Sequence, residues 1–429
     1  QRPPAPSTFY EVFRLRDSLK PAPDTKVQIK LEIWQSPYYS ADMIARIIAS
    51  VITDAAERFP VVTVVGPRQS GKTTLVRALF PDHVYVNLER PDTRALAAED
   101  PRSLLRDGTE NIILDEVQRL PDLLSWVQAF ADRENSPGQF VVTGSNQPLL
   151  GEAISQSLAG RTSVHRLLPL SMEELATAEI SASRDDLLVN GFLPRLYDAS
   201  LRPGELYSAY FATYVERDLR QLINVRDLSR FEAFMRLLAG RVGQLINLSA
   251  LSNDVGVTST TLGDWLSALE ASFLVLRVTP YHENLGKRLV KTPKLYFTEP
   301  GLLAWLLQIE TPAQAARDPL LGNIYENLVV VEAFKAAYNR GLEPRVHFYR
   351  DKSGLEVDLI REFQRRPFAM EIKAAATFSS EMLTQLEHFR RLYGSPAGAA
   401  LVYSGPRQTP VRGISICNHA DVADVLFAS

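Results

Sequence analysis

One stretch of this sequence constrains the fold more than any other. It runs from Val61 to Arg77 and reads VVTVVGPRQSGKTTLVR, so an apolar β-branched run precedes the pattern G-x-x-x-x-G-K-[ST] and a helix-prone segment follows it. A strand, a glycine-containing turn and a helix in this order form a phosphate-binding loop, in which backbone N–H groups and a helix N-terminus face the phosphates. We therefore predict a nucleotide site at this stretch.

The residue types in the loop match the chemistry of a nucleoside triphosphate. Lys72 is expected to neutralise β- and γ-phosphate oxygens, and the Thr73 hydroxyl is expected to bind Mg²⁺. ATP and Mg²⁺ are thus the predicted cofactors. The predicted nucleotide-binding residues are the loop, the threonines after it and one acid from a later strand: Gly66, Pro67, Arg68, Gln69, Ser70, Gly71, Lys72, Thr73, Thr74 and Asp115.

A second strand pattern predicts the hydrolytic residues. Residues 111–116 read NIILDE, which is typical of a short buried strand that ends in two carboxylates. In the phosphate-loop scheme Asp115 holds Mg²⁺, and Glu116 polarises the water that attacks the γ-phosphate. A solvated turn is the other interpretation of two adjacent acids. The preceding phosphate loop favours the hydrolytic one.

Strand and helix patterns alternate from residue 61 to about 170. Such alternation predicts an α/β fold with a doubly wound parallel sheet, and the nucleotide should bind at the carboxyl ends of its strands. The length of 429 residues predicts further domains. The predicted order is an N-terminal extension (1–40), the phosphate-loop core (41–170), a helical lid (171–235), a winged helix (236–295) and a C-terminal α/β domain (296–429).

The winged helix is predicted from a helix-turn-helix spacing and a basic hairpin. Residues 246–270 read as two helices joined by a tight turn at Gly256. Lys287, Arg288, Lys291 and Lys294 follow on a short hairpin. Because the whole chain has a formal net charge of −3, only such a local patch could contact DNA phosphates. We predict DNA contact by these four cations, and protein contact is the alternative.

The cysteine content and the apolar runs of the sequence indicate the cellular compartment of the protein. A single cysteine, Cys417, excludes an intramolecular disulfide and a cysteine-based metal cluster. No run of 18 apolar residues is present, so no membrane partner is expected. These features predict a cytoplasmic protein.

Several motifs together resemble a prokaryotic family of AAA-type P-loop ATPases with a C-terminal restriction-endonuclease-like domain. They include GPRQSGKTTL, YVNLERPD, IILDEVQRLPDL, VVTGSNQPLL, SLAGR and LLPLSMEEL, followed by YENLVVVEAF and GLEVDLI…MEIKA. The resemblance runs from about residue 45 to about residue 405. It implies an AAA-type ATPase core, a homo-oligomer that could be a ring, and the restriction-endonuclease-like fold for residues 296–429.

The resemblance also implies roles for individual residues. In AAA-type ATPases a polar side chain at the end of the strand 139–146 touches the γ-phosphate or its water; Thr143, Ser145 and Asn146 are candidates, and we assign Asn146. Arg161 is expected to reach a γ-phosphate, either its own or that of a neighbouring subunit. An exposed salt-bridging arginine is the alternative for this residue. The predicted catalytic set is Glu116, Lys72, Arg161 and Asn146.

The C-terminal domain contains a pattern that resembles the D…E-x-K constellation of restriction-type nucleases. Asp358 is followed thirteen residues on by Glu371-Ile-Lys373, and Glu326 could complete the acidic set from a helix. In such nucleases two acids bind Mg²⁺ and the lysine orients the attacking hydroxide. A solvated sheet face is the other interpretation. We predict the fold, with little or no cleavage activity.

The favoured function is Mg²⁺-dependent ATP hydrolysis by a DNA-associated motor or switch that acts on duplex or branched DNA. Two alternatives stay open. One is a nucleotide-controlled regulatory switch that binds a protein partner without DNA, and the other is an ATP-gated, Mg²⁺-dependent nuclease.

Overall fold

The structure is a computed structural model. It describes residues 43–427 except 106–109, 146–150, 152–153, 155, 200, 215–226, 282–291, 364 and 395. The predicted N-terminal extension therefore lies outside the described residues. So do four predicted site residues, Asn146, Lys287, Arg288 and Lys291.

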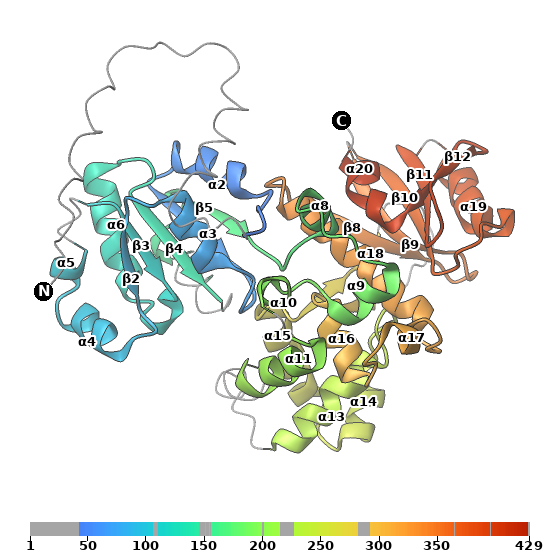
Figure 1. Cartoon of the computed structure of the whole chain (residues 1–429), viewed down its shortest axis with the longest axis horizontal. Helices are drawn as coiled ribbons and strands as arrows, with labels where there is room; N and C mark the ends of the chain where they lie inside the picture. The colour runs from blue at the N-terminus through green and yellow to red at the C-terminus, as the bar shows by residue number, and fades with distance from the viewer. Residues whose placement is uncertain are drawn as a thin grey trace, which may run out of the picture.

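The first part of the chain forms a five-stranded sheet in which all neighbouring strands are parallel. In spatial order the strands are β2 (Val84–Asn87), β3 (Ile112–Asp115), β4 (Phe140–Gly144), β1 (Val61–Val65) and β5 (Thr162–Arg166). Parallel strands need crossover connections, and the helices between them provide these connections. This arrangement confirms the predicted α/β core (Figure 1).

Helices cover both faces of the parallel sheet. Successive side chains of a strand point to opposite faces, so Val62 and Val64 pack on one side while Val61 and Val65 pack on the other. This explains why the run VVTVV is buried throughout. The first face is covered by α2 (Ala49–Ala56) and α3 (Lys72–Leu79), and the second by α4 (Pro91–Glu99), α5 (Pro101–Leu104), the 3-10 turn η2 (Val117–Arg119) and α6 (Leu123–Glu134).

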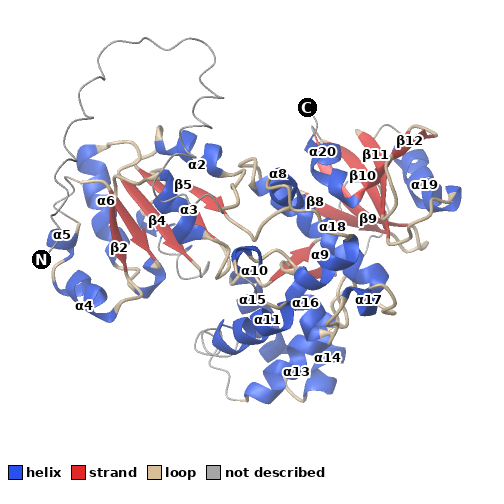
Figure 2. Cartoon of the chain, in the orientation of Figure 1, coloured by secondary structure: helices blue, strands red, loops and turns tan. Residues whose placement is uncertain are grey.

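The middle of the chain is mainly helical (Figure 2). Its helices are α8 (Met172–Thr177), α9 (Arg184–Asn190), α10 (Pro194–Asp198), α11 (Pro203–Tyr210), α13 (Leu228–Ala239), α14 (Leu248–Val255), α15 (Ser259–Ala271), α16 (Pro300–Leu306) and α17 (Pro312–Ala315). One antiparallel pair, β6 (Val275–Val278) and β7 (Lys294–Phe297), lies among them. The predicted domain boundaries after residues 235 and 295 fall inside α13 and β7.

The helix-turn-helix spacing corresponds to α14 and α15. Asn247 and Thr258 accept backbone hydrogen bonds at the start of each helix through their side chains, which is the N-cap interaction. Gly256 ends α14 at a φ of 74°, where a residue with a Cβ would be strained. The antiparallel pair β6 and β7 follows α15 in the chain.

The last part of the chain forms a mixed sheet with the strand order β12-β13-β11-β10-β9-β8. Strands β10, β11 and β13 run parallel to one another, while β8, β9 and β12 pair antiparallel with their neighbours. The strands are β8 (Val346–Arg350), β9 (Glu356–Phe363), β10 (Arg366–Lys373), β11 (Gly398–Tyr403), β12 (Gln408–Val411) and β13 (Ile414–Asn418). The helical elements are α18 (Leu321–Tyr338), η4 (Ser380–Leu383), α19 (Thr384–Tyr393), η5 (His419–Asp421) and α20 (Val422–Phe427).

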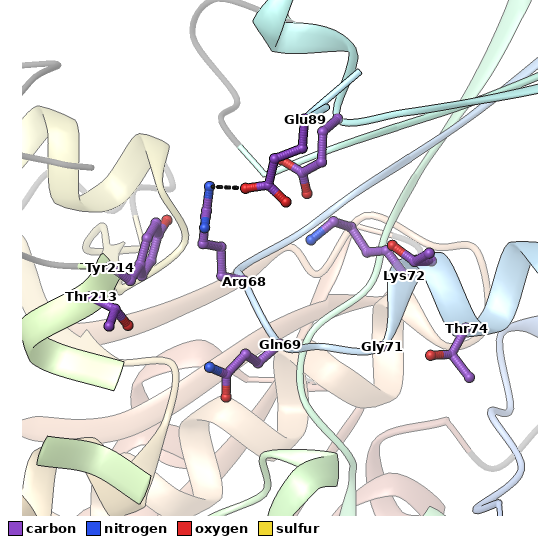
Figure 3. Close-up of a pocket in the computed structure, with 10 residues that line it drawn as sticks. Arg68, Gln69, Gly71, Lys72, Thr74, Glu89, Thr213 and Tyr214 are labelled. Atoms are coloured by element: carbon purple, nitrogen blue, oxygen red, sulfur yellow. Dashed lines mark hydrogen bonds and ion pairs between the residues drawn. The ribbon is translucent and has the colours of Figure 1, made fainter. Parts of the chain in front are cut away.

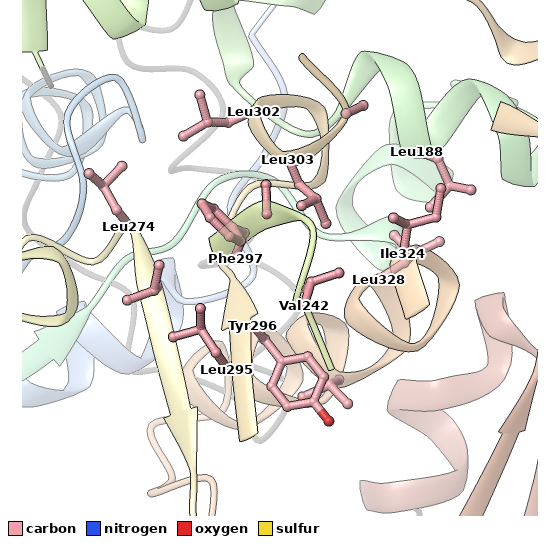
Figure 4. Packing of buried hydrophobic residues seen from close by; sticks show 14 of the residues in the cluster. Leu188, Val242, Leu274, Leu295, Tyr296, Phe297, Leu302, Leu303, Ile324 and Leu328 are labelled. Carbon is pink, nitrogen blue, oxygen red and sulfur yellow. The ribbon is translucent and has the colours of Figure 1, made fainter. Parts of the chain in front are cut away.

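One hydrophobic core joins the helical region to the mixed sheet. It runs from Leu170 to Leu426 and includes Tyr296 and Phe297 of β7 and Leu328 of α18 (Figure 4). Helix α18 is apolar or buried over most of its circumference, as expected of a helix with protein on all sides. In Figure 1 the parallel sheet lies on the left and the mixed sheet on the upper right, with α18 close to the latter. None of the described helices is long and apolar enough to cross a membrane.

Candidate functional site

The phosphate loop links the carboxyl end of β1 to α3, and two glycines permit its shape. A Cβ on Gly66 would lie 2.0 Å from the Leu167 carbonyl oxygen, so only glycine allows this close approach to the residue that follows β5. Gly71 has a φ of 89°, in the left-handed region where glycine is unstrained. The loop therefore curls directly into the N-terminus of α3, the arrangement that binds phosphate.

Lys72 is the first residue of α3, and its side chain lies inside the loop. Its Nζ donates hydrogen bonds to the carbonyl oxygens of Gly66 and Pro67, at 3.0 and 2.8 Å. The residue is buried. Burial lowers the pKa of Lys72, while the charges of Glu116 and Asp115 act in the opposite direction. A buried ammonium held by two carbonyls is poised to exchange them for phosphate oxygens.

Asp115 lies at the end of β3, where three hydroxyl groups converge on its carboxylate. Thr73 Oγ1 donates at 2.9 Å to Oδ2 and Tyr85 donates at 2.6 Å to the same oxygen, while Thr143 donates to Oδ1. The predicted pair of Mg²⁺ ligands, Thr73 and Asp115, is thus brought into direct contact. Hydroxyl and carboxylate oxygens are the ligands that Mg²⁺ prefers, so these residues fit the ion.

Glu116 directly follows Asp115. Its N–H donates to the same Thr143 hydroxyl that contacts Asp115, but its side chain has other partners. Its φ of 59° turns the backbone into the left-handed region, which is costly for a residue with a Cβ. Oε2 accepts hydrogen bonds from Ser145 Oγ at 3.1 Å and from Gln118 Nε2. The turn therefore aims the two neighbouring acids at different partners, as a metal ligand and a water-polarising base would require.

A cavity of about 290 Å³ opens beside the loop, and a helical segment closes one side of it. Arg68 and Lys72 line the core side, while Thr213 and Tyr214 line the other (Figure 3). Glu116 also lines the cavity. Arg68 Nη2 lies 3.5 Å from Glu89 Oε1, and its guanidinium is 5.7 Å from the Tyr214 ring centre. The cavity therefore lies between the parallel sheet and the helical region.

Arg46 supports the loop from beneath. Its Nη1 donates to the Ser70 carbonyl oxygen and its Nη2 to the Leu168 carbonyl oxygen, both at 2.7 Å. Its Nε pairs with Glu174 at 3.0 Å, and both side chains are buried. A guanidinium has donors in a rigid fork, so one residue fixes the loop backbone relative to the segment after β5.

The same segment is held from its other side by α18. The Met172 N–H donates to Glu332 Oε2 at 2.8 Å, and Lys335 Nζ donates to the Leu170 carbonyl oxygen at 2.7 Å. Glu332 and Lys335 also pair with each other at 2.7 Å. Residues 168–174 thus lie between the phosphate loop and α18.

Arg161 lies far from its own phosphate loop. Its carbonyl oxygen accepts a hydrogen bond from Val61 N, at the amino end of β1, and its side chain pairs with Asp132. The loop begins at the opposite end of β1, and five residues of strand span roughly 16 Å. The option that Arg161 contacts the γ-phosphate of its own subunit is therefore corrected. The exposed ion pair with Asp132 agrees with the alternative of a salt-bridging arginine, and contact with a neighbouring subunit stays a prediction.

A second polar cluster lies where β7, α18 and the mixed sheet meet. Lys294 Nζ is 3.0 Å from Glu326 Oε1 and 2.8 Å from Glu356 Oε1, and Tyr296 donates to the same Glu326 oxygen at 2.6 Å. Burial, and then repulsion by Asp358, raises the pKa of Glu326 above its ordinary range.

The acids of the predicted nuclease-like set point toward one region. Lys373 Nζ lies 2.6 Å from Glu371 Oε1 and 3.9 Å from Asp358 Oδ2, so these two carboxylates face a common cation. Asp358 Oδ2 also accepts a hydrogen bond from Ile372 N at 2.8 Å. The pKa of Glu371 is raised by burial and by Asp358, and to a smaller extent by Glu326.

The three acids of this set nevertheless do not form a metal site as they stand. Among the residues that the structure describes, no three His, Cys, Asp or Glu side chains are arranged to hold a metal ion. Lysine ammonium groups lie between the carboxylates instead. The predicted second metal set of Glu326, Asp358, Glu371 and Lys373 is therefore brought together without the geometry that a divalent ion needs.

Lys294 also requires a correction as a DNA-contacting residue. It is 2% exposed, lies in β7 and is paired with two acids, so it is not an exposed cation of a hairpin. The alternating pattern Lys294-Leu-Tyr296 gave no signal of this, because its partners are 32 and 62 residues away.

Several residues around the phosphate loop and its two acids were not predicted from the sequence. Tyr85, Gln118, Thr213 and Tyr214 approach the site from other elements. Only Gln118 had a local signal, since it lies two residues after Glu116. Of the candidates at the end of β4, Thr143 and Ser145 contact the acids, and Asn146 lies outside the described residues.

Three family models match successive parts of the chain. An AAA domain matches residues 58–176, a domain of unknown function (DUF8612) matches 181–313, and another domain of unknown function (DUF4143) matches 321–420. The AAA match contains the phosphate loop and both acids of the NIILDE strand, in agreement with the geometry.

Two relatives resemble the chain over most of its length. Uncharacterized proteins of Mycobacterium tuberculosis and Mycobacterium bovis are each 33% identical over 384 residues, covering 87% of this chain and 83% of the relative. Among solved structures, a Walker-type ATPase of Pyrococcus abyssi is 14% identical, with a TM-score of 0.38 over 60% of this chain and 94% of that one. This TM-score is too low to support an argument about function.

Proposed function

The chain belongs to the same family as the two mycobacterial proteins and carries an AAA domain, and from this premise we propose that it is a Mg²⁺-dependent ATPase. The observation that carries the proposal is the contact of Thr73 with Asp115, beside a separately held Glu116. A phosphate loop that only bound nucleotide would not need the second acid.

Each residue of the site has a distinct task in this proposal. Lys72 exchanges its bonds to the Gly66 and Pro67 carbonyls for phosphate oxygens when ATP binds. Thr73 and Asp115 would hold Mg²⁺, which would supply positive charge to offset that of the phosphates. Glu116 accepts a proton from, or orients, the attacking water, and Ser145 and Gln118 fix its carboxylate.

ATP also provides a means of moving the helical region. Arg68 lies in the loop, at the cavity, and contacts both Glu89 and Tyr214. A γ-phosphate attracts a nearby guanidinium more strongly than a neutral ring does. We infer that nucleotide binding draws Arg68 away from Tyr214 and thereby changes how the helical region contacts the core.

For the partner, the sequence favours a DNA-associated motor or switch, and the basis is the basic hairpin. Lys287, Arg288 and Lys291 lie outside the described residues, and they carry this proposal without Lys294. The expected DNA ligand is duplex or branched, and the expected assembly is a homo-oligomer.

One observation favours the second candidate, a switch that binds a protein partner. Helix α15, which would enter a DNA groove in a helix-turn-helix protein, has no Lys or Arg between Ser259 and Ala271. It carries Asp264 and Glu270 instead, and Glu270 pairs with Arg277 of β6. An acidic helix repels the phosphate backbone and is better suited to protein contact.

ATP turnover with different DNA ligands tests the proposal and separates the candidates. Phosphate release would be measured alone and with duplex, single-stranded and branched DNA, at two salt concentrations. The motor or switch on DNA predicts stimulation that weakens with salt, whereas the protein-partner switch predicts turnover that no DNA changes. Absence of Mg²⁺-dependent turnover under every condition would contradict the ATPase itself.

A further inference from the structure

Lys294 introduces an ammonium group into a group of four acids that we call the acidic cluster: Glu326, Glu356, Asp358 and Glu371. The ammonium bridges two of these acids, at 3.0 Å to Glu326 and 2.8 Å to Glu356. A divalent cation bridges carboxylates in the same way, at shorter distances of about 2.0 to 2.6 Å. Lys294 thus takes the position that a metal ion would take between these acids.

The position of this ammonium is fixed by the backbone around it. Strand β7 pairs with β6, where Lys294 faces Val278, and on its other side Lys294 forms a bridge with Leu245. The Gly243 N–H donates to the carbonyl oxygen of the next residue, Leu295, at 2.8 Å. A strand held on both sides keeps its side chains in place, so the lysine is a permanent part of the cluster.

The acidic cluster contains more carboxylates than cations. Lys294, Lys373 and the half-exposed Arg350, at 3.5 Å from Glu356, face four acids. Glu371 is only 3% exposed, and in the described structure its Oε2 is buried without a hydrogen-bond partner. An unpaired buried carboxylate oxygen is costly, and a cation is the natural ligand for it.

We propose that the Lys294 ammonium is a built-in cation that occupies the divalent-ion position of the acidic cluster and keeps metal ions out. The inference goes beyond ATP hydrolysis, which takes place at Lys72 and Asp115 and does not involve this cluster. It explains why the acids converge and yet do not form a metal site. Removal of the ammonium would leave Glu326 and Glu356 without their shared cation and available to hold a divalent ion, while Lys373 stays paired with Glu371.

Mn²⁺ binding to the full chain without nucleotide tests the proposal. Isothermal titration and the Mn²⁺ electron paramagnetic resonance signal would be recorded for wild type, Lys294→Met and Lys335→Met. Lys335 is the matched control, because it is also a buried lysine paired with a glutamate, Glu332, but lies outside the cluster. We expect Lys294→Met to bind one equivalent of Mn²⁺ at least tenfold more tightly than wild type or Lys335→Met.

A second substitution, Glu326→Gln, tests whether the Mn²⁺ site of Lys294→Met lies in the acidic cluster. In the Lys294→Met background it is expected to return Mn²⁺ binding to the wild-type level, because it removes one ligand oxygen of the cluster. Equal binding by Lys294→Met and Lys335→Met would overturn the proposal. So would a stoichiometric Mn²⁺ site in wild type that Glu326→Gln removes.

A folding defect would not prevent the test. Lys294→Gln keeps a polar group near both acids and serves as the second variant if Lys294→Met does not fold. If neither folds, wild type and Glu326→Gln are compared directly. Equally weak Mn²⁺ binding by both supports the built-in cation, and tighter binding by wild type contradicts it. None of these results depends on ATP turnover, so failure here is distinct from failure of the ATPase proposal.

Discussion

The carboxylate of Asp115 accepts hydrogen bonds only from hydroxyl groups among the contacts described above, those of Thr73, Tyr85 and Thr143. Hydroxyl donors orient a carboxylate without cancelling its charge, whereas an arginine at the same distance would neutralise it. Burial and the Asp115 hydrogen bond both raise the pKa of Tyr85, so this donor keeps its proton. These contacts therefore orient the Asp115 carboxylate through neutral donors alone.

Substitution of Glu116 should affect ATP hydrolysis without affecting ATP binding. Glu116→Gln is expected to retain ATP binding and to lower turnover by about 10²- to 10⁴-fold, because an amide cannot accept the proton of water. Lys72→Ala is expected to lose ATP binding instead. Binding of a fluorescent ATP analogue and phosphate release would be measured for both, with exposed Glu134→Gln as control. Normal turnover in Glu116→Gln would remove this residue from the mechanism.

At the scale of secondary-structure elements, Arg46 connects the phosphate loop to the segment between β5 and α8. It lies before α2, and its partners are Ser70 in the loop, Leu168 after β5 and Glu174 in α8. One guanidinium therefore joins the segment before α2, the phosphate loop and residues 168–174. The shape of the loop is thus determined partly by residues that follow it by about a hundred positions.

Arg46→Met is expected to destabilise the protein by about 3 to 5 kcal/mol, because it leaves Glu174 buried without its cation. ATP affinity should fall as well, since the Ser70 carbonyl loses its donor. Urea unfolding and nucleotide titration measure the two effects. The control is Arg202→Met, which removes an exposed pair with Glu205 and should cost less than about 1 kcal/mol. A change in Arg46→Met no larger than that of the control would contradict the prediction.

The sequence predicted the parts of the site that are local in the chain. Gly66 to Thr73 and Asp115-Glu116 lie at the ends of strands whose apolar runs are recognisable, and parallel strands bring their carboxyl ends together. Arg46, Tyr214 and Lys294 could not be predicted, because each meets its partners through packing of distant elements. Lys294 in particular looked like a hairpin cation, since a sequence does not show which side of a strand is covered.

At the scale of the whole molecule, the proposed DNA binding rests on the three basic residues that lie outside the described residues. Replacing Lys287, Arg288 and Lys291 with Ala is expected to flatten the salt dependence of DNA affinity by about 0.9 per lost phosphate contact. Lys294→Ala should leave the slope unchanged and lower stability, since that residue is buried in ion pairs. Fluorescence anisotropy over a range of salt concentrations measures the slope. An unchanged slope in the triple variant would favour the protein-partner switch.

Assembly can be tested through Arg161, which lies at the edge of the core away from its own loop. Arg161→Ala and Lys72→Ala subunits should each be inactive. Mixed in equal amounts in a ring with head-to-tail contacts, they should regain about one quarter of wild-type turnover, because that share of interfaces combines an intact loop with an intact arginine. Subunit exchange would be verified with two different tags. Exchange without recovered turnover would remove support for contact across an interface.

The continuous core from Leu170 to Leu426 determines how this family can be recombined. Family models divide the chain near residues 180 and 320, but α18 packs against α9, α16, β7 and β10 on both sides of the second division. A cut there would expose the apolar faces of both fragments. A domain consisting of the last 110 or so residues should therefore aggregate when it is transplanted alone into a relative.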